Sequence, residues 1–142
     1  MMQLLPLTQY PFKQTFATRW RDNDQYGHLN NAVYYEYFDS IANIFLIEHA
    51  GLNPQSSKQI AFVVHSNCDY FAPVSYPAKL NLGLAIKKLG KSSIVWTIGL
   101  FQENDPQCKA VGEFVHVFVD RESGEKCNIP ADVRAKLLEL EI

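Results

Sequence analysis

The run from Arg19 to Asn31 holds side chains that are well suited to chemistry on a carbonyl group. It contains two carboxylates, Asp22 and Asp24, together with a histidine, a glycine and two asparagines. A carboxylate can act as a base or as a nucleophile, and a helix that begins after the run offers free backbone N–H donors. A carboxylate beside a helix N-terminus therefore suits attack on a carbonyl carbon.

The segment that leads into this run is predicted to be a strand over residues 12–22. Phe16, Thr18 and Trp20 fall on one face of it, and charged side chains fall on the other. A turn follows over Gln25–Gly27, where the glycine allows the chain to reverse. The strand would therefore carry the chain directly into the acidic turn.

The segment after the run predicts a long helix from about Asn31 to Ala50. Asn30 is a favoured N-cap residue, and Gly51 followed by Pro54 is a common stop signal. Large apolar side chains recur at three- and four-residue steps on one face: Tyr34, Tyr37, Phe38, Ile41 and Phe45. Other apolar residues, such as Ile47, lie on its remaining sides, so we expect the helix to be enclosed by protein.

The rest of the chain is predicted to be mostly strands. Apolar and polar residues alternate over 62–71, 80–86, 94–100 and 110–120, and a short helix follows over 131–140. One strand, a long helix, four strands and a short helix indicate an α+β fold, with an antiparallel sheet wrapped around the long helix. Because no linker or repeat interrupts residues 1–142, we expect a single domain. The edge strands of such a sheet favour dimerisation edge to edge.

The composition is typical of a globular cytoplasmic protein. Hydrophobic residues make up 47% of the chain, and the formal net charge is −2 without a basic stripe, so we expect no nucleic-acid partner. No segment is long and apolar enough to span a membrane, and the start, Met1–Leu7, lacks the charged leader of a secretory signal. The three cysteines are widely spaced and form no zinc pattern, which indicates reduced thiols in a cytoplasm.

The acidic turn and the helix start together form a family signature. Residues 22–34 read Asp-Asn-Asp-Gln-Tyr-Gly-His-Leu-Asn-Asn-Ala-Val-Tyr and match a D-x-D-x-x-G-H-x-N-N-x-x-Y pattern position by position. The chain thereby resembles the hotdog-fold acyl-CoA thioesterases of the 4-hydroxybenzoyl-CoA thioesterase-like family, over roughly residues 12–122. The loop at 74–78 departs from the family, because relatives often carry Gly-Asp where this chain reads Val-Ser-Tyr-Pro-Ala. The resemblance implies a hotdog fold.

The resemblance assigns the chemistry to the second aspartate of the signature, which is Asp24. Its carboxylate would attack the thioester as a nucleophile, or would deprotonate a water as a general base. The backbone N–H of Asn31, at the positive end of the helix, would polarise the thioester carbonyl. Gly27 would provide the turn that brings these groups together, and His28 would position the substrate or brace the loop. An aspartate before a glycine is also a common turn cap.

Other residues of the pattern are expected to support the site. Asp22 should pair with a nearby arginine or backbone N–H. Tyr34 and Tyr35 are candidates for the wall of an acyl pocket, and His65 and Ser66 lie on a strand that relatives place near the active site of the partner. The expected substrate-binding residues are Gly27, His28, Asn30, Tyr34, Tyr35, His65 and Ser66. No second cluster completes a metal shell around the aspartates, so neither a metal ion nor a cofactor is expected.

The resemblance implies a hydrolase that converts an acyl-CoA, or an acyl-carrier-protein thioester, to a free acid and a thiol. A homodimer or a homotetramer is the implied assembly. Two alternatives stay open. A hotdog dehydratase acting on 3-hydroxyacyl thioesters would need a catalytic histidine, for which His28 is the candidate. A non-catalytic acyl-CoA binding module would lack the carboxylate, whereas Asp24 is present.

Overall fold

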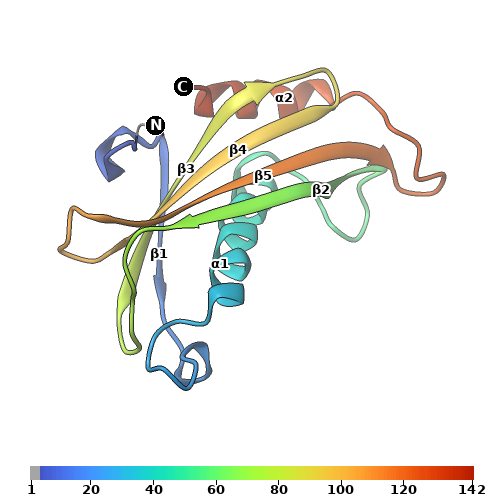
Figure 1. The fold of residues 1–142 in the computed structure, drawn as a ribbon. Coiled ribbons are helices and arrows are strands. Elements are labelled where there is room, and N and C mark those ends of the chain that lie inside the picture. Colours follow the sequence, from blue (N-terminus) through green and yellow to red (C-terminus); the bar gives the residue numbers. More distant parts are fainter. Residues whose placement is uncertain (1–3) are drawn as a thin grey trace.

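One long helix lies against a five-stranded antiparallel sheet (Figure 1). This computed structural model describes residues 4–142. The prediction about the start of the chain, Met1–Leu7, therefore falls partly on residues outside the described ones. In chain order the elements are η1 (Leu7–Gln9), β1 (Phe12–Ala17), η2 (Trp20–Asp22), α1 (Asn31–Ile44), η3 (Phe45–His49), β2 (Gln59–Tyr70), β3 (Lys79–Leu89), β4 (Ser93–Gln102), β5 (Cys108–Asp120), α2 (Ala131–Leu137) and η4 (Leu138–Leu140). Among the helices of the described part, none is both long and apolar enough to cross a bilayer.

The sheet has the order β1-β3-β4-β5-β2, and every neighbouring pair of strands is antiparallel. Figure 1 shows this sheet curving past α1, which confirms the predicted α+β architecture. β2 occupies one edge and pairs with β5 alone among the described strands. The register shifts between Val63 and His65, so Val64 is bulged out of the pairing. The exposed apolar side chains of this edge strand are Phe62, Val63, Val64 and Tyr70.

The core lies between α1 and the inner face of the sheet. Tyr37, Phe38 and Ile41 are buried, which confirms the predicted buried face of the helix. Gly112 on β5 makes room for this packing, because a Cβ there would lie 2.4 Å from a ring carbon of Phe38. The helix is not enclosed on all sides, since Ile47 in its continuation η3 is 42% exposed. That expectation was wrong because the sheet covers one side of the helix.

The first strand is shorter than its alternating pattern predicts. β1 ends at Ala17, and Trp20–Asp22 forms a 3₁₀ turn instead of continuing the strand. The backbone N–H of Arg19 donates to a carboxylate oxygen of Asp22 across 2.9 Å, which closes this turn. Trp20 therefore points outward and is 83% exposed, whereas the strand pattern predicted that it would share a face with Phe16.

Candidate active site

Asp24 lies in a tight turn that reverses the chain before the helix. Its backbone N–H donates to the carbonyl of His28 across 2.9 Å, and the N–H of Gly27 donates to the carbonyl of Asp24 across 3.1 Å. Gly27 has a φ of 82°, a left-handed conformation that favours glycine. One carboxylate oxygen of Asp24 accepts from the N–H of Tyr26 across 2.8 Å. Asp24 thus caps the turn with one oxygen, and its second oxygen makes no hydrogen bond within residues 4–142.

The helix start is fixed by its own cap and by two neighbouring segments. The side chain of Asn30 accepts from the N–H of Ala32 across 2.9 Å. The N–H of Asn30 donates to the carbonyl of Asp22 across 2.8 Å, and the N–H of Leu29 donates to that of Val74 across 2.7 Å. Asn31 is the first residue of α1, and in the described part of the chain its N–H has no acceptor. The helix therefore presents one fixed, free donor at its positive end.

Asp22 is fully buried, and its hydrogen bonds hold the 3₁₀ turn Trp20–Asp22 in place. Its carboxylate accepts from the Arg19 backbone, from the Arg19 guanidinium across 3.0 Å and from the Tyr37 hydroxyl. Burial acts to raise the pKa of Asp22, but the hydrogen bonds from Tyr37 and Arg19 outweigh it and hold the pKa below its usual range. Arg19 also pairs with Glu36, with 2.8 Å between Nη1 and Oε1. The predicted structural role of Asp22 is confirmed.

A cavity of about 460 Å³ brings much of the signature together. Its wall consists of Asp24, Tyr26, His28, Leu29, Asn31, Tyr34, Tyr70, Phe71, Ala72 and Pro73. Four of the expected site residues are in it, namely Asp24, His28, Asn31 and Tyr34. Residues 70–73, which run from the last residue of β2 into the loop after it, also line the wall and were not predicted to take part. The signal for them in the sequence is the run Ser-Asn-Cys-Asp-Tyr-Phe-Ala-Pro at 66–73, which resembles the second-strand pattern of the same family.

Other expected residues lie outside this wall. The Tyr35 ring packs against Phe114, with 6.1 Å between centroids, between the helix and the sheet. Gly27 and Asn30 shape the turn and the helix cap instead of the cavity surface. His65 and Ser66 are exposed on the edge strand β2. Within one chain, Tyr35, His65 and Ser66 are therefore not brought to the cavity that contains Asp24.

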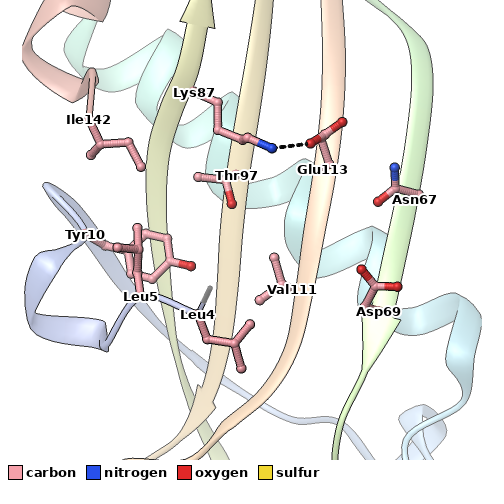
Figure 2. A pocket seen from close by; sticks show the side chains of 10 residues that line it. All are labelled: Leu4, Leu5, Tyr10, Asn67, Asp69, Lys87, Thr97, Val111, Glu113 and Ile142. Atoms are coloured by element: carbon pink, nitrogen blue, oxygen red, sulfur yellow. Dashed lines mark hydrogen bonds and ion pairs between the residues drawn. The ribbon is translucent and has the colours of Figure 1, made fainter. Parts of the chain in front are cut away.

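A smaller hollow of about 240 Å³ lies on the face of the sheet that is turned away from α1 (Figure 2). Apolar side chains, including Leu5 and Val111, line it beside polar groups. Lys87 in its wall forms an ion pair with Glu113, with 2.9 Å between Nζ and Oε2. This hollow contains no residue of the signature, and Glu113 balances the charge of its lysine.

Comparison with known proteins identifies related chains and structures. Residues 26–109 match the family model of the thioesterase superfamily. The crystal structure of the PA5185 protein from Pseudomonas aeruginosa strain PAO1 is 45% identical, with a TM-score of 0.93 over 96% of this chain and 95% of that chain. Slr0204 from Synechocystis, a 1,4-dihydroxy-2-naphthoyl-CoA thioesterase, is 18% identical, with a TM-score of 0.82 over 91% of this chain and 96% of that one. SAV2348 from Staphylococcus aureus, whose structure is a complex with CoA, is 15% identical, with a TM-score of 0.83 over 99% and 86%.

The structures of Slr0204 and SAV2348 show only that the fold is shared, whereas the match to the family model shows the family of this chain. This match begins at Tyr26, inside the turn that follows Asp24, and extends through α1, β2, β3 and β4 to the start of β5. More than half of the chain is therefore covered, including the helix start that carries the free donor. The chain belongs to the thioesterase superfamily, and it is a thioester hydrolase.

Proposed function

We propose that this chain hydrolyses an acyl-CoA to a carboxylic acid and CoA, with Asp24 and the Asn31 N–H as the groups that act on the thioester. The observation that carries the proposal is their common cavity. Asp24 offers a carboxylate oxygen without a hydrogen-bond donor in the described chain, and Asn31 offers an N–H without an acceptor there. One group suits attack on the carbonyl carbon, and the other suits the carbonyl oxygen.

Asp24 would act in one of two ways. As a general base it removes a proton from a water, whose oxygen attacks the carbonyl carbon. As a nucleophile its own oxygen attacks, and water then hydrolyses the acyl-enzyme anhydride. In both routes the carbonyl oxygen gains negative charge, which the Asn31 N–H and the helix end stabilise. The C–S bond then breaks, and the thiolate leaves and takes up a proton.

CoA is the thiol that the comparisons favour. One structural neighbour is named for hydrolysis of an aromatic acyl-CoA, and another contains bound CoA. An acyl-carrier-protein thioester would present the same reacting bond. His28 and Tyr34 in the cavity wall would contact the substrate beside the thioester.

A homodimer would complete the site through the open edge of β2. Val64 is 60% exposed and Phe62 is 53% exposed on this strand, and an edge with free backbone groups pairs readily with a second copy. Pairing there would place His65 and Ser66 toward the partner. A homotetramer would contain two such dimers. Light scattering should report a dimer or a tetramer for the wild type and a monomer for Val64→Lys.

The direct test is hydrolysis of a panel of short, medium, long and aromatic acyl-CoAs. Asp24→Asn should lower kcat by roughly a hundred- to ten-thousand-fold, with an unchanged circular dichroism spectrum. Asp39→Asn is the matched control, because Asp39 is an exposed carboxylate on α1 outside the cavity wall. Its kcat should stay within about twofold of the wild type.

Three results would contradict the proposal. Full activity of Asp24→Asn would show that the Asp24 carboxylate takes no part in the hydrolysis. Hydration of crotonyl-CoA without hydrolysis of saturated acyl-CoAs would indicate a dehydratase that uses His28. Tight binding of acyl-CoAs without turnover of any of them would indicate a binding module.

A further inference from the structure

The loop between β2 and β3 runs beside the acidic turn and is hydrogen-bonded to it (Figure 1). The N–H of Leu29 donates to the carbonyl of Val74 across 2.7 Å. The hydroxyl of Ser75 donates to the carbonyl of Gly27 across 2.8 Å, which joins residues 48 positions apart. The loop therefore supports the turn from a distant part of the chain.

The same loop is fixed at its far end to the segment that enters the turn. The N–H of Tyr76 donates to the side-chain oxygen of Asn23 across 3.0 Å. The N–H of Thr18 donates to the carbonyl of Ala78 across 3.0 Å, and the N–H of Ala78 donates to the Thr18 hydroxyl across 2.8 Å. Ser75 thus projects from a backbone that is itself held in place.

Asp24 lies between two of these attachments, because Asn23 precedes it and Gly27 follows it. Its own hydrogen bonds with Tyr26, Gly27 and His28 are local and define only the shape of the turn. Among the hydrogen bonds of residues 4–142, the Ser75–Gly27 bond is the one that joins residues 24–28 to a distant part of the chain. This bond therefore determines where the tip of the turn lies.

The two groups proposed to act on the thioester are held by different means. The N–H of Asn31 belongs to α1 and is fixed by the helix. Asp24 lies on a turn whose tip, residues 25–28, is exposed, so its distance from that N–H depends on the position of the turn. Reacting groups must be placed closely, and a shift of about 1 Å can cost about a hundredfold in rate.

We propose that Ser75 is a positioning residue, whose hydroxyl holds the turn so that Asp24 lies at the distance from the Asn31 N–H that hydrolysis needs. This inference rests on the proposed function, because it takes Asp24 as the acting carboxylate. Ser75 is outside the wall of the active-site cavity, so it acts on kcat and not on substrate binding. It lies in the loop 74–78, where this sequence departs from the family pattern, so the family resemblance assigns it no role.

Steady-state kinetics provide the first readout. Ser75→Ala should lower kcat for one acyl-CoA by about 3- to 10-fold and change KM by less than about twofold. Ser75→Thr keeps the hydroxyl and should hold kcat within about twofold of the wild type. Ser40→Ala is the matched control, because the Ser40 hydroxyl also donates to a backbone carbonyl, that of Glu36 across 2.7 Å, outside the cavity wall. It should leave kcat and KM unchanged.

Hydrogen exchange provides a second readout that needs no turnover. The N–H groups of Asp24 and Gly27 both donate within the turn, so they report its opening. Ser75→Ala should speed their exchange by about 2- to 10-fold, the size expected for loss of one hydrogen bond, and Ser75→Thr should not. Exchange within α1 should stay as in the wild type. The midpoint of urea unfolding should shift by less than about 0.5 M, because the Ser75 side chain is exposed.

A double variant tests whether Ser75 acts through Asp24. In the Asp24→Asn protein the carboxylate that Ser75 positions is gone, so adding Ser75→Ala should not lower the residual hydrolysis further. A further fall by the same factor as in the wild type would show that Ser75 acts independently of Asp24, and the proposal would be wrong.

The outcomes separate this inference from the proposed function. If the wild type hydrolyses no acyl-CoA, or if Asp24→Asn is fully active, the proposed function fails. If Asp24→Asn is inactive but Ser75→Ala keeps the wild-type kcat, the positioning role of Ser75 alone is wrong. A raised KM with an unchanged kcat in Ser75→Ala would also overturn it, because Ser75 would then act on substrate binding.

Discussion

The hydroxyl of Tyr70 donates a hydrogen bond to the backbone carbonyl oxygen of Asn31 across 2.9 Å. Tyr70 is the last residue of β2 and Asn31 is the first residue of α1, so this bond joins the edge strand to the helix end. The ring of Tyr70 also meets that of Tyr34 edge to face, with 5.0 Å between centroids. The proposed oxyanion donor is therefore held by the strand as well as by its own helix cap.

Tyr70→Phe should lower kcat by about 3- to 10-fold and change KM by less than about twofold. The variant keeps the ring against Tyr34 but removes a hydrogen bond with a net value of about 1 kcal/mol, which positions the Asn31 N–H. Steady-state kinetics with one acyl-CoA measure the split between kcat and KM. Tyr10→Phe is the control, because it removes a tyrosine hydroxyl on the opposite face of the sheet. A change in KM alone would show that Tyr70 contacts the substrate and does not position the donor.

Asp22→Asn should destabilise the fold by about 2–3 kcal/mol, because it removes the charge from a buried carboxylate that accepts from Arg19 and Tyr37. The folded pKa of Asp22 is lowered, so its contribution is present above the unfolded pKa and is lost as pH falls through the folded pKa. Urea unfolding at neutral pH measures the difference. Glu36→Gln should cost less than about 1 kcal/mol, because Glu36 is an exposed partner of Arg19. Equal costs for both variants would contradict the assigned role of the buried carboxylate.

Periodicity was a sufficient guide wherever packing decides the local structure. The helix start at Asn31 and the four later strands follow from local signals, namely an N-cap and alternating side chains. The end of β1 does not, because alternation continues through Trp20 while the Arg19–Asp22 hydrogen bond turns the backbone. A side-chain contact with the backbone leaves no mark in the hydrophobic pattern.

The cavity wall could be predicted only in part, for a different reason. Asp24 and Asn31 lie in one local segment, whereas Tyr70 reaches the helix end through a contact between residues 39 positions apart. Strand pairing and helix docking decide that contact, and neither can be located from one sequence. Tyr34 and Tyr35 could not be told apart either, because neighbours on a helix point about 100° apart and the direction of the cavity was unknown.

Gly112→Ala should destabilise the protein by about 1–3 kcal/mol. The added Cβ would come within 2.4 Å of the Phe38 ring, which is fully buried. Thermal or urea unfolding measures the loss. Phe38→Leu in the same chain removes the clashing ring atoms, so the double variant should be more stable than the sum of the two single changes predicts. Simple additivity would show that the ring does not press on this position.

The pH dependence of stability should show the titration of His116. The indole N–H of Trp96 donates to His116 Nδ1 across 2.7 Å, so the ring must stay neutral to accept, and burial lowers its pKa from 6.5 to about 4. Between pH 6.5 and about pH 4, His116 binds a proton in the unfolded chain but stays neutral in the folded chain. The contribution of neutral His116 is therefore complete above pH 6.5 and falls by up to about 3 kcal/mol as pH drops toward 4. His116→Gln keeps a hydrogen-bond acceptor for Trp96 but does not titrate. Its free energy of unfolding, measured in urea across this pH range, should therefore fall less steeply than that of the wild type. Parallel curves for the two proteins would show that His116 is protonated in the folded state.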